Sequence, residues 1–273
     1  MSLRIQTNIE AFDAHRNLVN TENQLAQSME RLSSGFRINK AADDAAGLAI
    51  SEKLESQIGG LDQAQRNGQD AVSLVQTGEG ALAEVQSMLQ RVRDLAVEYN
   101  NGTVSATDKQ AITAEIAQLC AEVFQIGTQT SFNGINLLTG NATITFQVGA
   151  NDGETIAVNA IHLFGGGASY QVDSALFSFS GSMVSLSAID AAIENVSNAR
   201  ATFGSVQNRL GHRLNNLATY EENLQASDSS IKDVDMASEM VNLTKLQILQ
   251  QAGTSMLAQA NQSPQSVLTL LRG

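Results

Sequence analysis

The sequence predicts a mainly α-helical fold: an elongated rod of long, antiparallel, coiled-coil-like helices, with paired N- and C-termini and a small β-hairpin region at the middle of the chain. Three observations lead to this fold class. The 273 residues include one proline, Pro264, where average usage would give roughly 14, so almost nothing interrupts a long helix. Aromatic residues make up 4% and Trp is absent, so the core must be aliphatic, as in helix seams. Apolar residues also recur at steps of three and four over most of the chain.

The first two expected helices cover the N-terminal part of the chain. The first carries an apolar residue at every seventh position, at Ala11, Leu18, Leu25 and Leu32. The second covers residues 46–99, and its apolar stripe runs from Leu54 to Ala96 without a proline. The neighbouring carboxylates of Asp43 and Asp44 favour a cap for a helix that begins near Ala45.

Three further helices are expected, and the start of each is marked by side chains that can cap unpaired amide groups. The marking pairs are Thr107 with Gln110, Ser187 with Asp190, and Ser230 with Asp233. The first of these helices carries the stripe Ile112, Ile116, Leu119, Val123 and Ile126. The second carries Ile189, Ile193, Val196, Phe203, Leu210, Leu214, Leu217 and Leu224, and the last carries Leu246, Leu249, Gly253, Met256 and Ala260.

Between residues 140 and 185 the apolar period changes to two. Ile144, Phe146 and Val148 alternate with polar residues, and Asn151-Asp152-Gly153 then predicts a turn toward a second strand. This region is therefore expected to contain a β-hairpin. The glycines at 165–167 and the Ser-rich run that follows indicate a loop, with a second short hairpin around residues 175–180.

The lengths of these helices predict how the chain is organised. A helix over residues 46–99 would span roughly 80 Å, whereas a compact globule of this chain length has a radius of gyration of about 19 Å. We therefore expect the chain to run out and return, pairing residues 46–99 with 187–225. The predicted domains are a terminal helical core domain of residues 1–40 and 231–273, and a helical shaft domain of residues 41–230 that includes the β-hairpin region at about 140–185.

Charge is distributed unevenly along the chain. The net charge is −12, yet residues 41–230 alone hold eight basic and twenty-one acidic side chains, so the two ends are close to neutral. Nearly neutral ends can pack against copies of themselves, whereas an acidic middle suits a solvated surface. A lone terminal helix pair leaves apolar seams uncovered, which predicts self-assembly through a polymerisation seam. Its expected members are Leu18, Leu25, Leu32, Leu246, Leu249 and Met256.

Several functional classes are disfavoured by the composition. Cys120 is the single cysteine, which excludes an intrachain disulfide framework and an all-cysteine metal cage. The three histidines lie in different regions without a metalloprotease motif, and the sequence contains no catalytic constellation, so we expect no enzyme activity, no cofactor and no metal.

The acidic net charge argues against nucleic acid binding. No apolar run is long enough to cross a membrane, and the charged first 30 residues do not resemble a cleaved signal peptide. A soluble coiled-coil binding module would explain the heptads but not the neutral ends.

Long motifs in both halves of the chain resemble bacterial flagellin. Residues 29–54, MERLSSGFRINKAADDAAGLAISEKL, are similar to a signature of that family, and Thr130-Ser131-Phe132-Asn133-Gly134 resembles a second one. Further similar segments are SVQNRL at 205–210, LNNLATYEENLQASDSSIKDVDMASEM at 214–240 and SVLTLLRG at 266–273. The resemblance covers residues 1–140 and about 183–273, which is most of the chain.

The resemblance implies a structural subunit that self-assembles into the bacterial flagellar filament for motility. It implies terminal helices that line the filament core, a hairpin-bearing shaft outside them, and a middle too short for the outer domains of larger members. It also implies an extracellular location after type III export without a cleaved signal peptide. The partners it implies are other copies of the chain, an export chaperone, the filament cap and hook-junction proteins. The alternative is a hook-filament junction protein, whose terminal helices are similar.

One surface patch follows from the same resemblance. Residues 90–97 resemble the segment contacted by the flagellin-sensing Toll-like receptor of vertebrates, and Arg91, Leu95 and Glu115 match its main contact positions. Arg91 and Leu95 are four residues apart and share a helix face. Leu95 lies outside the stripe that contains Ala96, so we expect an exposed leucine that also packs between protofilaments.

Overall fold

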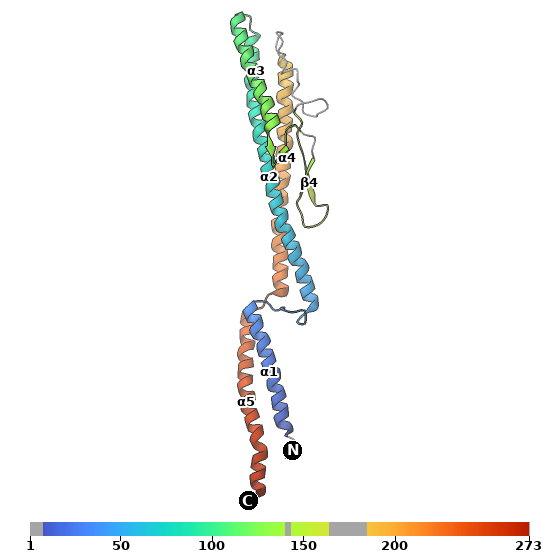
Figure 1. Ribbon diagram of the computed structural model, residues 1–273, viewed down its shortest axis with the longest axis vertical. Coiled ribbons are helices and arrows are strands. Elements are labelled where there is room, and N and C mark those ends of the chain that lie inside the picture. Colours follow the sequence, from blue (N-terminus) through green and yellow to red (C-terminus); the bar gives the residue numbers. More distant parts are fainter. Residues whose placement is uncertain (1–7, 140–142, 164–184, 273) are drawn as a thin grey trace. The chain divides into compact units, whose positions relative to one another are not determined.

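The computed structural model describes residues 8–139, 143–163 and 185–272, and it confirms the mainly helical fold class (Figure 1). Its helices are α1 (Ile9–Ser34), α2 (Ala45–Tyr99), α3 (Ala106–Gln129), α4 (Leu186–Lys232) and α5 (Met236–Arg272). The expected loop at 165–167 and the second hairpin around 175–180 lie outside the described residues. The long helices follow directly from the scarcity of proline and the unbroken helical periodicity.

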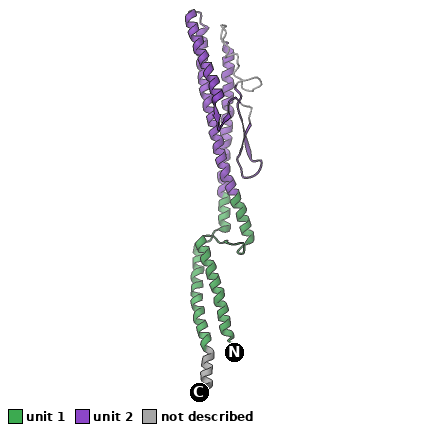
Figure 2. Ribbon diagram, viewed as in Figure 1, with its two compact units in different colours: residues 1–56, 223–273 green, residues 57–222 purple. Residues whose placement is uncertain are grey.

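The chain divides into two compact units, coloured separately in Figure 2. Unit 1 contains residues 1–56 and 223–273, and unit 2 contains residues 57–222. Both divisions fall inside long helices, α2 and α4, so no loop marks the boundary between the units.

Within unit 1, α1 and α5 pack as an antiparallel pair. The side chain of Asn8 donates a hydrogen bond of 2.7 Å to the carbonyl of Ala260, while near the other end of α1 the Val234 amide donates to the Gly35 carbonyl at 3.0 Å. Between these points the helices approach closely, because a Cβ atom on Gly253 would lie only 3.3 Å from Leu18 Cδ1. The expected pairing of the two terminal segments is thus present within one copy of the chain.

Capping side chains explain where the helices begin. Asp44 Oδ1 accepts the Gly47 amide at 2.9 Å, which confirms the cap expected before α2. Helix α3 begins two residues earlier than the Thr107 signal suggested, because Ser105 is its N-cap and accepts the Asp108 amide at 3.2 Å. The start expected at Ser230 is wrong, since α4 continues through that residue and Asp235 caps α5 instead, accepting the Ala237 amide at 3.0 Å.

Unit 2 is built from α2, α3 and α4 around one contiguous apolar core. Ion pairs trace the antiparallel course of α2 against α4, with Glu79 bound to Arg200 and Arg93 bound to Asp190, each at 2.6 Å. This confirms the expected return of the chain along α2. The largest fully buried side chains of unit 2 are Leu61, Leu74, Leu82, Leu89, Ile116, Leu137, Leu138, Leu163, Ile189, Phe203 and Leu210.

Two small antiparallel hairpins also belong to unit 2. Strands β3 (Thr143–Gln147) and β4 (Thr155–Asn159) pair as the alternating pattern predicts, with Gly153 in the turn at φ +85°. Strands β1 (Ser131–Phe132) and β2 (Ile135–Asn136) form a second hairpin that the alternation does not reveal, because each strand is only two residues long. Its signal is the Asn133-Gly134 dipeptide, whose residues both take positive φ, at 49° and 78°.

Candidate functional site

Large apolar side chains are exposed on several helices of this protein. Across the described ranges, no three His, Cys, Asp or Glu side chains gather where they could hold a metal ion. In the same part of the chain no helix is both long and apolar enough to cross a membrane. The candidate site is the set of apolar helix faces that remain exposed.

Large apolar side chains are exposed mainly on unit 1. Of the sixteen that are exposed among the described residues, twelve belong to unit 1 although unit 2 is the longer unit. The twelve are Ile9, Phe12, Val19, Met29, Phe36, Ile50, Met236, Met240, Val241, Ile248, Leu249 and Met256. A concentration of this kind marks a surface that is covered by a partner.

Helix α5 presents two different apolar faces. Leu246 is 4% exposed and, with half-buried Gly253 and Ala260, it forms the face that packs on α1. Leu249 and Met256 are instead 45% and 64% exposed and lie outside that contact. The single apolar stripe predicted from the sequence thus contains residues of two faces. One face packs against α1, and the other is exposed to solvent.

The six residues expected to form the polymerisation seam are divided between these environments. Leu18, Leu25 and Leu32 on α1 are half-buried, and Leu246 is buried. Only Leu249 and Met256 are freely accessible to another molecule. We call the exposed apolar side of α5, which includes Leu249 and Met256, its outer face. Val241 and Ile248 also belong to this face, but the sequence pattern did not single them out. The feature that could have revealed them is that each is an apolar residue next to a heptad position.

Two open grooves flank the contact between α1 and α5. One has a volume of about 360 Å³ and is lined by Glu10, Ala14, Met256, Gln259 and Ala260. The other has a volume of about 420 Å³ and is lined by Asn8, Ala11, Phe12, His15, Leu257 and Asn261. Each groove borders a strongly exposed apolar side chain, Met256 in the first and Phe12 in the second. The surface therefore offers both projecting side chains and hollows.

A second candidate surface lies on α2 and α3, where Arg91 and Glu115 form an exposed ion pair. Arg91 Nε and Nη2 both donate to Glu115 Oε1, at 3.0 and 2.8 Å. This hydrogen bonding raises the pKa of Arg91 above its ordinary value. The pairing places two residues that are far apart in sequence on one face of unit 2.

Leu95 does not belong to that exposed face. It is 2% exposed, so the expectation of an accessible leucine beside Arg91 is wrong. Helix α2 packs against both α3 and α4. Two neighbouring helices bury a wider apolar stripe than one does, so both Leu95 and Ala96 lie in the core. The accessible apolar side chain in this segment is Val97, which is 50% exposed.

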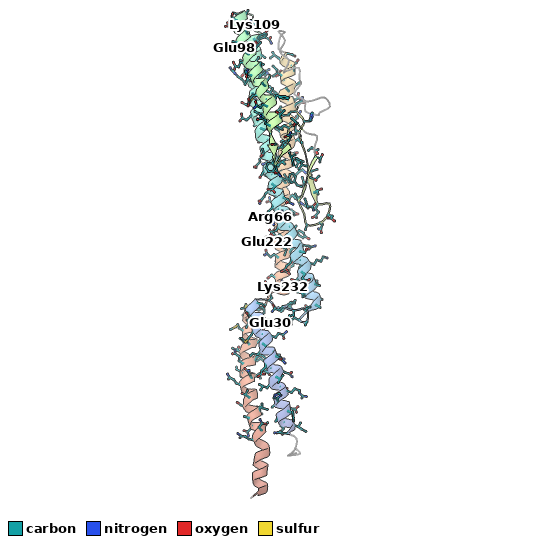
Figure 3. The ribbon with its side chains drawn as sticks, viewed as in Figure 1. Glu30, Arg66, Glu98, Lys109, Glu222 and Lys232 are labelled. Atoms are coloured by element: carbon teal, nitrogen blue, oxygen red, sulfur yellow. The ribbon has the colours of Figure 1, made fainter. Side chains whose placement is uncertain are left out.

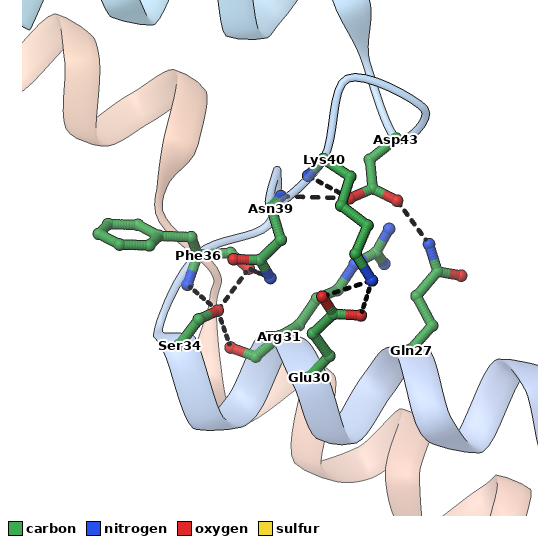
Figure 4. A network of polar contacts seen from close by, with 8 residues as sticks. All are labelled: Gln27, Glu30, Arg31, Ser34, Phe36, Asn39, Lys40 and Asp43. Atoms are coloured by element: carbon green, nitrogen blue, oxygen red, sulfur yellow. Dashed lines mark hydrogen bonds and ion pairs between the residues drawn. The ribbon is translucent and has the colours of Figure 1, made fainter.

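The connection between α1 and α2 is held by a network of polar contacts (Figure 4). Asp43 accepts the amides of Asn39 and Lys40 at 3.1 and 3.0 Å and the Gln27 side chain at 2.9 Å. The two backbone hydrogen bonds lower the pKa of Asp43. Lys40 in turn pairs with Glu30 at 2.7 Å. These contacts give a structural role to several polar residues of the 29–54 segment, because they hold the backbone of this connection in place.

Together these features define a class: a helical structural protein whose terminal helices expose apolar faces for association. Comparison with models of known protein families supports this class. The bacterial flagellin N-terminal helical region matches residues 5–143, and the bacterial flagellin C-terminal helical region matches residues 186–271. The chain belongs to the bacterial flagellin family. Only residues 144–185 separate the two matched regions, so the chain lacks the large outer domains of longer flagellins.

Two flagellins of known name align with nearly the whole chain, and one solved structure aligns with about half of it. A flagellin of Halalkalibacterium halodurans is 48% identical over 98% of this chain and 99% of its own length. A flagellin of Bacillus subtilis is 44% identical over 99% of this chain and 100% of its own length. The crystal structure of Bacillus cereus flagellin is 36% identical, covers 56% of this chain and 88% of that chain, and has a TM-score of 0.48.

The two family matches and the two flagellins of known name assign the chain to a class of structural proteins. It is a subunit of the flagellar filament and not an enzyme, and the alternative of a hook-filament junction protein is not favoured. The family supports homopolymeric assembly and a place in the flagellar filament.

Proposed function

We infer that this subunit assembles by packing its terminal helical core domain, residues 1–40 and 231–273, around the filament axis with the same segments of neighbouring copies. The observation that carries this proposal is the concentration of exposed apolar side chains on unit 1. In this arrangement residues 41–230 form the shaft outside the core, where their excess of acidic side chains meets solvent.

The energetics favour a shared core. Burying a large apolar side chain contributes about 1.5–3 kcal/mol, and α5 alone exposes six such side chains among its described residues, at positions 236, 240, 241, 248, 249 and 256. Association costs translational and rotational freedom as well as side-chain ordering. Several outward apolar contacts per copy are enough to offset that cost, which makes polymerisation depend on protein concentration.

The decisive experiment replaces Leu249 by Asp. Because Leu249 is exposed in one copy, L249D should leave the helical content of the soluble subunit unchanged. In the filament it would bury an unpaired charge, so we expect the critical concentration for assembly to rise at least about 100-fold, or about 2.8 kcal/mol per subunit. M256D should behave in the same way.

The matched control is Gln251→Asp, which adds the same charge at an exposed polar position of α5. Circular dichroism measures folding, and sedimentation with electron microscopy measures assembly. Filaments formed by L249D at the ordinary concentration would refute the proposal. An equal loss of assembly in Q251D would show that charge, and not loss of an apolar contact, blocks polymerisation.

The proposal extends to export and to partners. The subunit would leave the cell through the flagellar export channel without a cleaved signal peptide, a route that is consistent with its membership of the flagellin family. An export chaperone would cover the outer apolar face of α5 before assembly, and the filament cap and hook-junction proteins would contact the same face at the filament ends. L249D should then also weaken capture by the chaperone, and N-terminal sequencing of secreted subunits should find an unprocessed start.

For the Arg91 and Glu115 pair we propose a shared role in packing between protofilaments and in recognition by the flagellin-sensing Toll-like receptor. Leu95 would support this patch from beneath. Arg91→Ala should weaken both assembly and receptor signalling, measured by sedimentation and a reporter-cell assay, while Arg66→Ala on the same helix serves as the control. Unchanged assembly and unchanged signalling in R91A would disprove the role of the patch.

A further inference from the structure

The chain contains three Asn-Gly dipeptides, at Asn67, Asn101 and Asn133, and the structure places them in three different environments. Asn-Gly is the dipeptide in which the following amide nitrogen is least hindered, because glycine has no Cβ. An asparagine side chain can then be attacked by that nitrogen. Whether the attack occurs depends on how freely the peptide between the two residues can rotate.

Asn67 lies in the interior of α2 and is held on both sides. Its side-chain nitrogen donates a hydrogen bond of 3.0 Å to the Gln147 carbonyl. The following residue, Gly68, is buried, and a Cβ atom there would lie 2.7 Å from Leu214 Cδ2. Cyclisation at this position would require α2 to unfold locally.

Asn133 is exposed but lies in a tight turn between paired strands. Its backbone is left-handed, with φ at 49°, and Phe132 pairs with Ile135 directly across the turn. The Leu137 amide also donates to the Thr130 carbonyl at 3.1 Å, which closes the base of the hairpin. Rotation of the Asn133-Gly134 peptide would break this pairing.

Asn101 lies in the connection between α2 and α3, outside any helix or strand. Asn101 and Gly102 are both exposed, and a Cβ atom on Gly102 would meet no atom within 4 Å. The Thr103 amide donates to Asn101 Oδ1 at 3.3 Å, which turns the carboxamide back toward the peptide groups that follow it. The Asn101 amide donates to the Glu98 carbonyl at 3.0 Å, and the Asn101 carbonyl accepts the Val104 amide at the longer distance of 3.4 Å. Of the three Asn-Gly sites, this is the one that lies in neither a helix nor a hairpin of paired strands.

We propose that Asn101 is a site of spontaneous deamidation and isoaspartate formation in this subunit. The Gly102 amide nitrogen forms a bond to Asn101 Cγ, the bond from Cγ to Nδ2 breaks, and ammonia leaves with the proton of the Gly102 amide. Water then adds to either carbonyl of the resulting succinimide, which gives aspartate or isoaspartate at position 101. The net reaction consumes one water and releases one ammonia.

The product changes the charge at the end of a helix. Asn101 follows α2 by two residues, so the modification places a carboxylate near the negative end of the helix dipole. Glu98 already lies in the last turn of α2 (Figure 3). The modified form should therefore show faster amide exchange in the last turn of α2 than the unmodified form.

The test uses the full-length folded protein, incubated at mildly alkaline pH and then digested with pepsin in acid, where cyclisation is slow. Mass spectrometry quantifies deamidation in the three Asn-Gly peptides, with an isoaspartyl methyltransferase assay for the rearranged product. Because local opening limits the other sites, we expect modification at Asn101 to be at least about fivefold faster than at Asn133, and no detectable modification at Asn67. In urea the three rates should converge.

Gly102→Ala is the matched variant, since the site has room for a methyl group and the added Cβ hinders attack on Asn101. It should slow deamidation at position 101 and leave the rate at Asn133 unchanged. Equal rates at the three sites in the folded protein would overturn the proposal. So would incorporation of ¹⁸O from labelled water without any isoaspartate, because direct hydrolysis forms no succinimide.

Discussion

At the scale of single residues, substitutions of two glycines in α2 can distinguish the effect of core packing on stability from the effect of backbone conformational freedom. A Cβ atom on Gly78 would lie 2.7 Å from the ring of Phe203, which is 1% exposed, whereas one on Gly80 would meet nothing within 4 Å. Both lie in the interior of the same helix, where alanine is intrinsically preferred over glycine. The two positions therefore form a matched pair.

We expect Gly78→Ala to lower the free energy of unfolding by about 1–3 kcal/mol, because overpacking a core displaces its side chains. Gly80→Ala should raise the free energy of unfolding by about 0.5–1 kcal/mol. Urea unfolding followed by circular dichroism measures both. Equal stability of the two variants would mean that α2 and α4 do not approach as closely at Phe203 as the structure indicates.

Cys120 gives a second prediction at this scale. The thiol is 4% exposed, and burial raises its pKa from 9.0 to about 11. The unfolded chain therefore loses the thiol proton at a lower pH than the folded chain, so this group's stabilising contribution is complete below pH 9 and declines as the pH rises toward 11. Alkylation by iodoacetamide at pH 9 should be slow in the folded protein and fast in denaturant. Rapid alkylation of the folded protein would contradict this burial.

At the scale of elements, the tip of the β3 and β4 hairpin is attached to two helices. Asn67 on α2 donates to the Gln147 carbonyl at 3.0 Å, and Arg213 Nε on α4 donates to the Val148 carbonyl at 3.1 Å. A Cβ atom on Gly60 would lie 3.1 Å from that of Ala150, so the turn also packs closely on α2. A two-stranded hairpin is marginal by itself, and these contacts supply its support.

Replacing Arg213 by Gln should loosen this hairpin, because hydrogen bonds from charged groups contribute about 1.5–3 kcal/mol. We expect faster hydrogen exchange of the amides in β3 and β4, with little change in α3. Arg66→Gln is the control, since Arg66, labelled on α2 in Figure 3, is exposed. Its side chain donates a hydrogen bond of 3.2 Å to Gln63 of the same helix. Equal effects of the two variants would show that the Val148 contact does not hold the hairpin.

At the scale of the whole molecule, the two units differ in how much core they contain. The contiguous apolar core lies entirely in unit 2, whereas the buried aliphatic side chains among the described residues of unit 1 are Ile38 and Leu246. Local stability follows buried apolar contacts. Unit 1 should therefore be the less stable part of the soluble subunit.

Limited proteolysis of the monomer should accordingly cleave near residues 40 and 230 and leave a resistant fragment of about residues 41–230. In the filament the same ends should be protected, because neighbouring copies would bury their outer apolar faces. Mass spectrometry of the fragments measures the boundaries in both states. Equal protection of the ends in monomer and filament would contradict the proposed role of the terminal helices.

The sequence by itself determined the helices, the pairing of α2 with α4, the β3 and β4 hairpin and the family. These depend on local periodicity, on the near absence of proline and on long contiguous motifs, all of which are properties of neighbouring residues. The Asp44 cap belongs to the same group, because a capping side chain acts within three residues.

Only the tertiary structure decided which faces of those helices are covered. Leu95 lies beside an apolar stripe and Leu249 lies within one, yet Leu95 is buried because α2 has two partners, and Leu249 is exposed because α5 packs on α1 through the face of Leu246. The sequence also did not predict that α4 continues beyond Ser230. Extending an existing helix costs less free energy than nucleating a new one, so a weak capping signal at Ser230 does not end α4. Periodicity defines a stripe, but the number and direction of the neighbours that cover it are set by contacts between residues far apart in the chain.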